Sequence, residues 1–95
     1  MAAGPHLILF YDYVEDVLER RAPHREAHLA RIGEWVAAGR MLMAGALGDP
    51  PTGAAFVLPG DDPAEAGRFA EGDPYVAAGL VTARRVVPWT VVAPA

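Results

Sequence analysis

Cysteine, serine and lysine are all absent from the chain of 95 residues. Without cysteine the protein has no disulfide, thiolate metal site or cysteine nucleophile, and without serine it has no serine nucleophile. All eight basic residues are arginine, whereas flexible nucleic-acid-binding tails are rich in lysine. The formal net charge is -4. Both observations argue against a nucleic-acid partner.

Long apolar runs are absent too, although 53% of the residues are hydrophobic and only 21% are charged. No stretch approaches the roughly 20 apolar residues of a membrane span, so we expect no membrane partner. The length fits a single domain over residues 1–95, with its core at about 6–92. The first residues lack a basic region followed by an apolar run, so we expect an uncleaved start and a cytoplasmic protein.

Turn-forming residues divide the chain into alternating strands and helices. Branched and aromatic residues cluster in four segments that we predict as strands, at about 6–13, 41–47, 54–58 and 80–92. Between them we predict helical segments at about 14–21, 23–38, 63–71 and 74–79. Three of these helical segments begin with proline, which fits the first position of a helix.

The predicted order β-α-β-β-α-β indicates an α+β, ferredoxin-like fold. With right-handed crossovers it forms a four-stranded antiparallel sheet with its helices on one face. The first strand is apolar on both sides, because Ile8 and Phe10 alternate with Leu7, Leu9 and Tyr11. A sheet face that is both open and apolar predicts a homodimer in which two sheets pack face to face.

Arg25 and His28 fall within the arc of helix 23–38 that we predict to be buried. At about 100° per residue this arc of roughly 120° also holds four apolar side chains, Leu29, Ile32, Trp35 and Val36. A buried guanidinium or imidazole is costly unless it is hydrogen-bonded or paired. These two side chains therefore indicate either a satisfied structural network or the lining of a pocket.

His28 is a candidate general base, because a neutral imidazole can take a proton from a carbon or hydroxyl acid. The alternative is a packed histidine bonded to a backbone carbonyl. Arg25, one helical turn earlier, suits a carboxylate or enolate oxygen. Its alternatives are an ion pair with Glu26 or Asp12, or a position at the surface.

Asp73 is a candidate partner for the imidazole, which it could orient. An aspartate followed by proline is also a helix N-cap, as at Asp62, so a structural role is the alternative. Tyr11, Tyr13 and Tyr75 could donate hydrogen bonds to a substrate oxygen, or they could pack half-buried with their hydroxyls at the surface.

Metal and cofactor signals are weak in this sequence. His24 and His28 have the spacing of two metal ligands on one helical face. The stretch H-R-E-A-H nevertheless lacks the metalloprotease order, and the one other histidine is His6, so we expect no metal. The glycines form no phosphate-binding pattern, and we expect no cofactor.

Three segments resemble the signature of the YciI-like (YCII-related) family. They are R-E-A-H-L-A-R-I (Arg25 to Ile32), A-A-G-R-M-L-M-A-G-A-L (Ala37 to Leu47) and D-P-Y-V-A-A-G-L (Asp73 to Leu80). The similarity runs from about Leu7 to Trp89, and its most specific part is D-P-Y-x-x-A-G-L.

The resemblance implies a ferredoxin-like protomer in a dimeric α+β barrel, with His28 and Asp73 as a catalytic dyad and Arg25 at a conserved basic position. It suggests lyase-type elimination, dehalogenation or isomerisation of small ring compounds. We therefore expect a homodimeric enzyme whose His28 deprotonates a small cyclic or unsaturated organic acid, an anionic ligand contacted by Arg25, Tyr11 and Tyr75. The alternatives are a dimeric module that binds a small metabolite without catalysis, and an assembly domain with a vestigial site.

Overall fold

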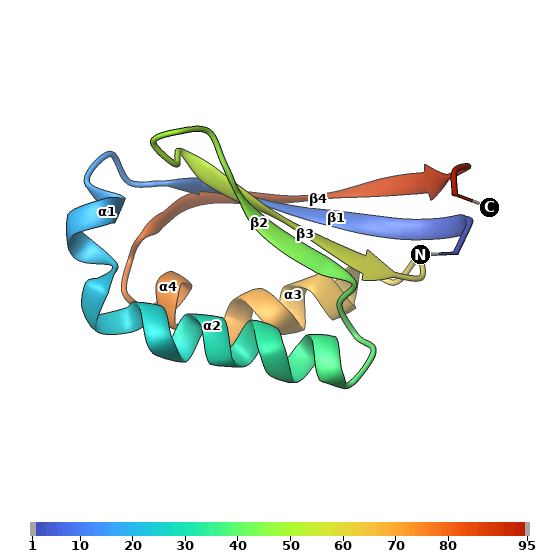
Figure 1. Cartoon of the computed structure of the whole chain (residues 1–95), viewed down its shortest axis with the longest axis horizontal. Coiled ribbons are helices and arrows are strands. Elements are labelled where there is room, and N and C mark those ends of the chain that lie inside the picture. The colour runs from blue at the N-terminus through green and yellow to red at the C-terminus, as the bar shows by residue number, and fades with distance from the viewer. Residues whose placement is uncertain (1, 95) are drawn as a thin grey trace.

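The computed structural model describes residues 2–94 of the chain. The elements in chain order are β1 (Gly4–Tyr13), α1 (Val17–Arg20), α2 (Ala22–Ala37), β2 (Met43–Leu47), β3 (Gly53–Pro59), α3 (Pro63–Glu71), α4 (Pro74–Ala77) and β4 (Val81–Val91). The helices lie on one side of the sheet, and the other side is left open (Figure 1).

The four strands form one antiparallel sheet in the order β2-β3-β1-β4. β1 is central, and its residue Leu9 pairs with Phe56 of β3 on one side and Val86 of β4 on the other. Partners in an antiparallel sheet point to the same face, so these three side chains all point toward the helices. The predicted ferredoxin-like α+β fold is confirmed.

Most of the predicted elements have a boundary displaced by one to three residues. The long helix begins at Ala22 rather than Pro23, so proline occupies its second position. The second strand begins at Met43 rather than Met41, although Leu42 still donates its N–H to the carbonyl of Val57 at 2.8 Å. The cap predicted at Asp62 is confirmed, because its side chain accepts the N–H of Ala64 at 3.1 Å.

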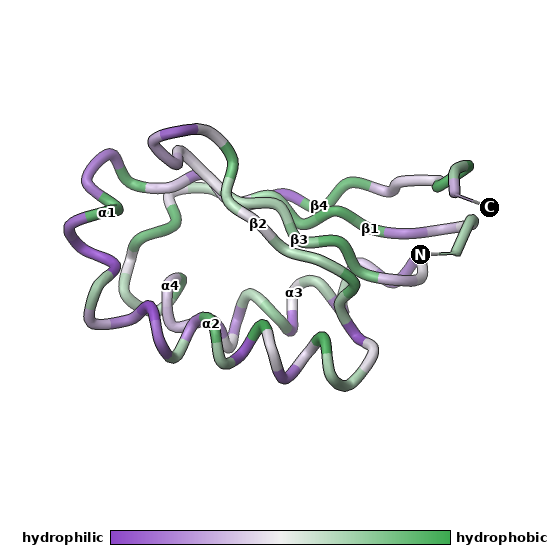
Figure 2. The backbone as a smooth tube through the Cα atoms, in the orientation of Figure 1, coloured by the Kyte–Doolittle hydropathy of each residue, from purple (hydrophilic) through white to green (hydrophobic). Residues whose placement is uncertain are grey.

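The core lies between the sheet and the helices, and aromatic rings form its centre. Phe69 of α3 is 0% exposed, and its ring centroid lies 5.2 Å from that of Trp35 and 5.1 Å from that of Phe56. Hydrophobic residues are concentrated along the sheet and alternate with hydrophilic ones along α2 (Figure 2). This alternation is the pattern of a helix buried on one side.

The predicted buried arc of α2 is wrong at three positions, because Arg25 is exposed as well as Leu29 and Val36. Leu29 is 48% exposed and Val36 is 44% exposed, whereas His28 and Trp35 are buried. Leu29 borders an open cavity instead of packing into the core. The helix therefore rests on the sheet along a narrower strip than its apolar residues suggest.

Arginine side chains connect α2 and the loop that follows it to α3 through hydrogen bonds. Arg31 donates from Nε to the carbonyl of Phe69 at 3.1 Å, which satisfies a carbonyl near the end of α3. Arg40 lies 3.7 Å from the ring centroid of Trp35 and donates to Glu65. Hydrogen bonds from Arg40 and Arg68 lower the pKa of Glu65.

The sheet face opposite the helices carries apolar side chains that no helix within residues 2–94 covers (Figure 1). Ile8, Phe10 and Val87 on this face are only partly buried, and the guanidinium of Arg85 lies 4.4 Å from the ring centroid of Phe10. No helix within residues 2–94 is long and apolar enough to cross a bilayer.

Candidate active site

Two residues 45 positions apart in the sequence meet beneath the sheet. His28 lies on the sheet side of α2, and Asp73 precedes Pro74 at the start of α4. His28 Nδ1 lies 2.7 Å from Asp73 Oδ1. The histidine is 5% exposed and the aspartate 0%. Asp73 Oδ1 also accepts the N–H of Tyr75 at 3.0 Å and caps α4, so the predicted cap is present together with the contact to His28.

A third hydrogen bond completes the environment of the Asp73 carboxylate. The hydroxyl of Tyr11, on the helix-facing side of β1, donates to Asp73 Oδ2 at 2.8 Å. Each partner of the carboxylate thus acts as a donor, because an ionised carboxylate can only accept; in the neutral form of the imidazole, Nδ1 then carries the proton and the lone pair lies on Nε2. Burial, followed by the nearby charge of Asp73, raises the pKa of Tyr11 well above its usual value, so this hydroxyl remains a donor.

The plane of the imidazole is fixed by aromatic neighbours. The ring of Tyr75 stacks on His28 with centroids 3.6 Å apart and planes 5° from parallel. The edge of Phe56 lies on another side, with a centroid distance of 6.3 Å. Because Nδ1 is bound to Asp73 and both neighbouring rings restrict rotation, Nε2 has a defined position at the cavity wall.

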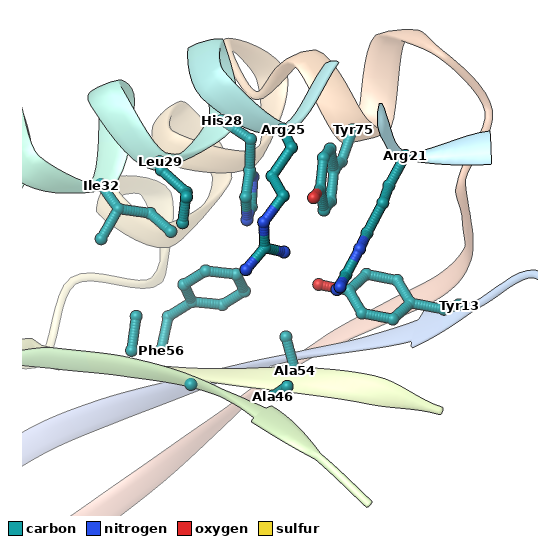
Figure 3. A pocket seen from close by; sticks show the side chains of 12 residues that line it. Tyr13, Arg21, Arg25, His28, Leu29, Ile32, Ala46, Ala54, Phe56 and Tyr75 are labelled. Atoms are coloured by element: carbon teal, nitrogen blue, oxygen red, sulfur yellow. The ribbon is translucent and has the colours of Figure 1, made fainter. Parts of the chain in front are cut away.

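The cavity beside His28 has a volume of about 220 Å³ and lies between α2 and strands β2 and β3. Its walls combine a few polar groups with apolar and aromatic side chains (Figure 3). The floor is made of small residues of β2 and β3, Ala44, Gly45, Ala46 and Ala54. This mixture of apolar walls and a few convergent polar groups is typical of small-molecule sites.

The three candidate tyrosines occupy different positions. Tyr11 was expected to contact substrate, but its hydroxyl is bound to Asp73 and its side chain is absent from the cavity lining. Tyr13 and Tyr75 do line the cavity. Burial raises the pKa of Tyr13 to about 12, against the opposing charges of Arg21 and Arg25. The hydroxyl of Tyr75 is buried and has no hydrogen-bond partner among residues 2–94.

Two arginines reach the cavity from the helical side (Figure 3). Arg25 was predicted to lie near His28 and does line the same cavity, and it forms no ion pair with Glu26, Asp12 or any other described residue. Arg21 was not predicted to be a site residue, because its position before Pro23 indicated that it belongs to the preceding helical turn. Its backbone is nevertheless helical, with φ -75° and ψ -22°, so the spacing of four between the two arginines was the available signal.

Among the described residues, the histidine pair considered for metal binding is not grouped with a third candidate ligand. Within residues 2–94, no group of three or more histidine, aspartate or glutamate side chains is arranged to hold a metal ion. His24 lies one turn from His28 but is absent from the cavity lining.

Solved structures of similar fold include a dehydrochlorinase and an uncharacterized protein. The 5-chloro-2-hydroxyhydroquinone dehydrochlorinase TftG from Burkholderia phenoliruptrix, in complex with 2,5-dihydroxybenzoquinone, matches with a TM-score of 0.74 and 24% identity, over 90% of this chain and 93% of that one. An Agrobacterium tumefaciens protein matches with a TM-score of 0.59 and 8% identity, over 95% of each chain. An uncharacterized NIPSNAP domain protein from Burkholderia xenovorans matches with a TM-score of 0.56 and 14% identity, over 96% and 97%. At these identities the likenesses show the fold.

No curated protein matches the chain. The family model of the YCII-related domain, however, matches residues 5–90. This range includes the three segments that carry the resemblance in the sequence, and it spans every element from β1 to nearly the end of β4. The chain belongs to the YCII-related domain family.

Proposed function

We propose that this chain is a small enzyme of lyase or isomerase type, in which His28 Nε2 removes a proton from a small cyclic or unsaturated organic acid. The observation that carries the proposal is the 2.7 Å hydrogen bond from His28 Nδ1 to the buried Asp73 carboxylate, at the wall of a cavity. With Nδ1 held in this way, the lone pair on Nε2 is available to a substrate proton.

The surrounding groups suit the charges that form during proton removal. The imidazolium that His28 becomes is stabilised by the adjacent carboxylate of Asp73. As the C–H bond breaks, negative charge develops on an acidic or carbonyl oxygen of the substrate. Arg25 and the Tyr75 hydroxyl are proposed to bind that oxygen, and Tyr11 acts as a positioning residue that holds Asp73.

Two outcomes are compatible with this first step. In an elimination, the electron pair of the C–H bond forms a carbon–carbon double bond, and a leaving group such as chloride departs with its own electron pair. In an isomerisation, the imidazolium returns its proton to a different carbon. The elimination is supported by the similar fold of TftG, which is named as a dehydrochlorinase.

Removal of the imidazole tests this proposal. Chlorinated hydroxyquinols, unsaturated lactones and small unsaturated acids would be screened with the wild-type protein, and His28→Ala would be assayed on any substrate found. We expect turnover to fall by at least about 10²-fold, because general-base catalysis contributes on that scale. His24→Ala, on the same helix but outside the cavity lining, is the matched control and should keep full turnover. Full activity of His28→Ala would refute the proposed role.

A binding module without catalysis is the second candidate, and it is favoured by the two cavity arginines, Arg21 and Arg25, which have no ion-pair partner within residues 2–94. Such a site would hold an organic anion and release it unchanged. The two functions differ in their product: an anion that binds near His28 but is recovered intact from every member of the screen would favour the binding module.

We also propose that the protein is a homodimer whose subunits pack through the open sheet face. Support comes from the apolar side chains that the helices leave uncovered, including Ile8, Phe10 and Val87. Monomers rarely leave a large contiguous apolar patch uncovered. Two copies of the same face form a self-complementary interface with twofold symmetry.

Phe10→Asp is expected to convert the dimer to a monomer, because it replaces an apolar ring at the interface with a carboxylate whose burial is costly even beside Arg85. Light scattering after size-exclusion chromatography measures the mass directly. Val36→Asp places the same charge on the exposed side of α2, where Val36 is 44% exposed, and should leave the mass unchanged. A wild-type monomer, or a Phe10→Asp dimer at the same concentration, would contradict this interface.

A further inference from the structure

The cavity carries two positive charges without a carboxylate to neutralise them. Arg21 and Arg25 both line it, and neither forms an ion pair with any residue in 2–94. Arg20 and Arg68, by contrast, each have an acidic partner within 4.0 Å. Asp73 lies behind His28, and its carboxylate is already occupied by three donors.

The position of these arginines is unfavourable without a ligand. They are four residues apart, a spacing at which like charges on a helical surface repel. They also lie at the beginning of α2, where the helix dipole is positive, and the first turn of α2 contains no acidic residue. An anion bound in the cavity would relieve both effects.

The other polar groups that face the cavity also call for a ligand rich in oxygen. Tyr75 is 2% exposed, and its buried hydroxyl lacks a partner among the described residues. The raised pKa of Tyr13 keeps its hydroxyl protonated at neutral pH. The remaining lining is apolar, with Leu29, Ile32 and Phe56 on its walls. The cavity therefore offers charged and neutral donors around an apolar middle.

We infer that the ligand is a dianion, with two acidic oxygens on opposite sides of a small planar body, one bound by Arg25 near His28 and the other by Arg21 with Tyr13. The volume of about 220 Å³ is below the roughly 300–1,000 Å³ of sites for drug-sized ligands, so a single ring fits better than two. The assignment of one oxygen to Arg25 rests on the proposed function. Arg21 and Tyr13 form this second anion point, which determines which ligands bind and takes no part in the proposed reaction.

Unreactive aromatic acids test this inference. Benzoate has one carboxylate, whereas phthalate, isophthalate and terephthalate place two at increasing separations on the same ring. Binding would be measured by calorimetry at one low ionic strength, because salt screens exposed charges. We expect at least one dicarboxylate to bind about tenfold more tightly than benzoate, since a second arginine–carboxylate contact is formed.

Arg21→Ala should remove this preference and bring the best dicarboxylate to the affinity of benzoate, while benzoate itself binds nearly as before. Arg20→Ala, with the same loss of charge one residue earlier and outside the cavity lining, should change neither affinity. Equal weakening of both acids by Arg21→Ala, or no preference for any dicarboxylate in the wild type, would overturn the second anion point. Because the probes do not react, a failure here is separate from a failure of His28→Ala to reduce turnover.

Discussion

Asp73→Asn is expected to reduce turnover by about 10³-fold in a protein that still folds. Whichever way the amide is turned, the negative charge beside His28 is lost, and the imidazolium formed during proton removal is left without its counter-charge. A charge pair about 4 Å apart is worth about 4 kcal/mol at an effective dielectric constant near 20, which corresponds to about 10³-fold in rate. The short contact of 2.7 Å and the complete burial of Asp73 place the pair in this range.

The fold should survive this substitution, because asparagine is as good an N-cap as aspartate. The amide oxygen can still accept the N–H of Tyr75 at the start of α4. The kinetic signature separates positioning from binding: kcat should fall far more than KM changes, because Asp73 does not line the cavity.

The chain provides its own matched control for this experiment. Asp62 caps α3 before Pro63 in the same way that Asp73 caps α4 before Pro74, but it is exposed and distant from the cavity lining. Asp62→Asn should therefore keep full turnover. If both variants lose activity alike, or if Asp73→Asn keeps it, the carboxylate does not act through His28.

Phe69→Ala is expected to have the largest effect on stability, about 3–5 kcal/mol of the free energy of unfolding. The ring is 0% exposed and lies between Trp35 and Phe56, so its removal leaves a cavity that the surrounding rings can fill only in part. Small domains have about 5–15 kcal/mol in total, and this loss would leave many molecules unfolded at moderate temperature.

Urea unfolding measures this loss, provided that the slope of free energy against urea is unchanged. Phe69→Leu should lose less, because more of the apolar volume remains. Val92→Ala, at a position 79% exposed, should change stability by no more than about 0.5 kcal/mol. Since Phe69 does not line the cavity, folded Phe69→Leu should also keep its activity. A loss below 1 kcal/mol in Phe69→Ala would show that α3 does not anchor the core through this ring.

The fold was predictable because local signals agreed with one another along most of the chain. The cluster of branched and aromatic residues in β1 and the proline after aspartate at the start of α3 and α4 each point to the observed elements. Met41 caused the error in the boundary of the second strand. It is 1% exposed, and a buried apolar residue just before a strand cannot be distinguished by its type from one inside the strand. Leu29 and Val36 misled the core, because helical periodicity identifies an apolar face but not how wide its contact with the sheet is.

The site was less accessible to sequence reasoning than the fold. Nothing in the spacing of His28 and Asp73 brings them together; the residue types allowed the pair beside a purely structural role for Asp73, and the family resemblance favoured it. The partner of the Tyr11 hydroxyl depends on where α4 lies beneath β1, which propensities do not specify. Arg21 was overlooked because Pro23 was interpreted as separating two helices, whereas the backbone of Arg21 continues the helical path at their junction.

The floor of the cavity is supplied by a different part of the fold from the groups proposed for chemistry. Ala44, Gly45 and Ala46 belong to β2, an edge strand whose five residues are all exposed, while His28 and Asp73 belong to the helical layer. Edge positions tolerate substitution more readily than the core does. A larger side chain at one of these positions would therefore narrow the space for a ligand and leave the contact between His28 and Asp73 unchanged.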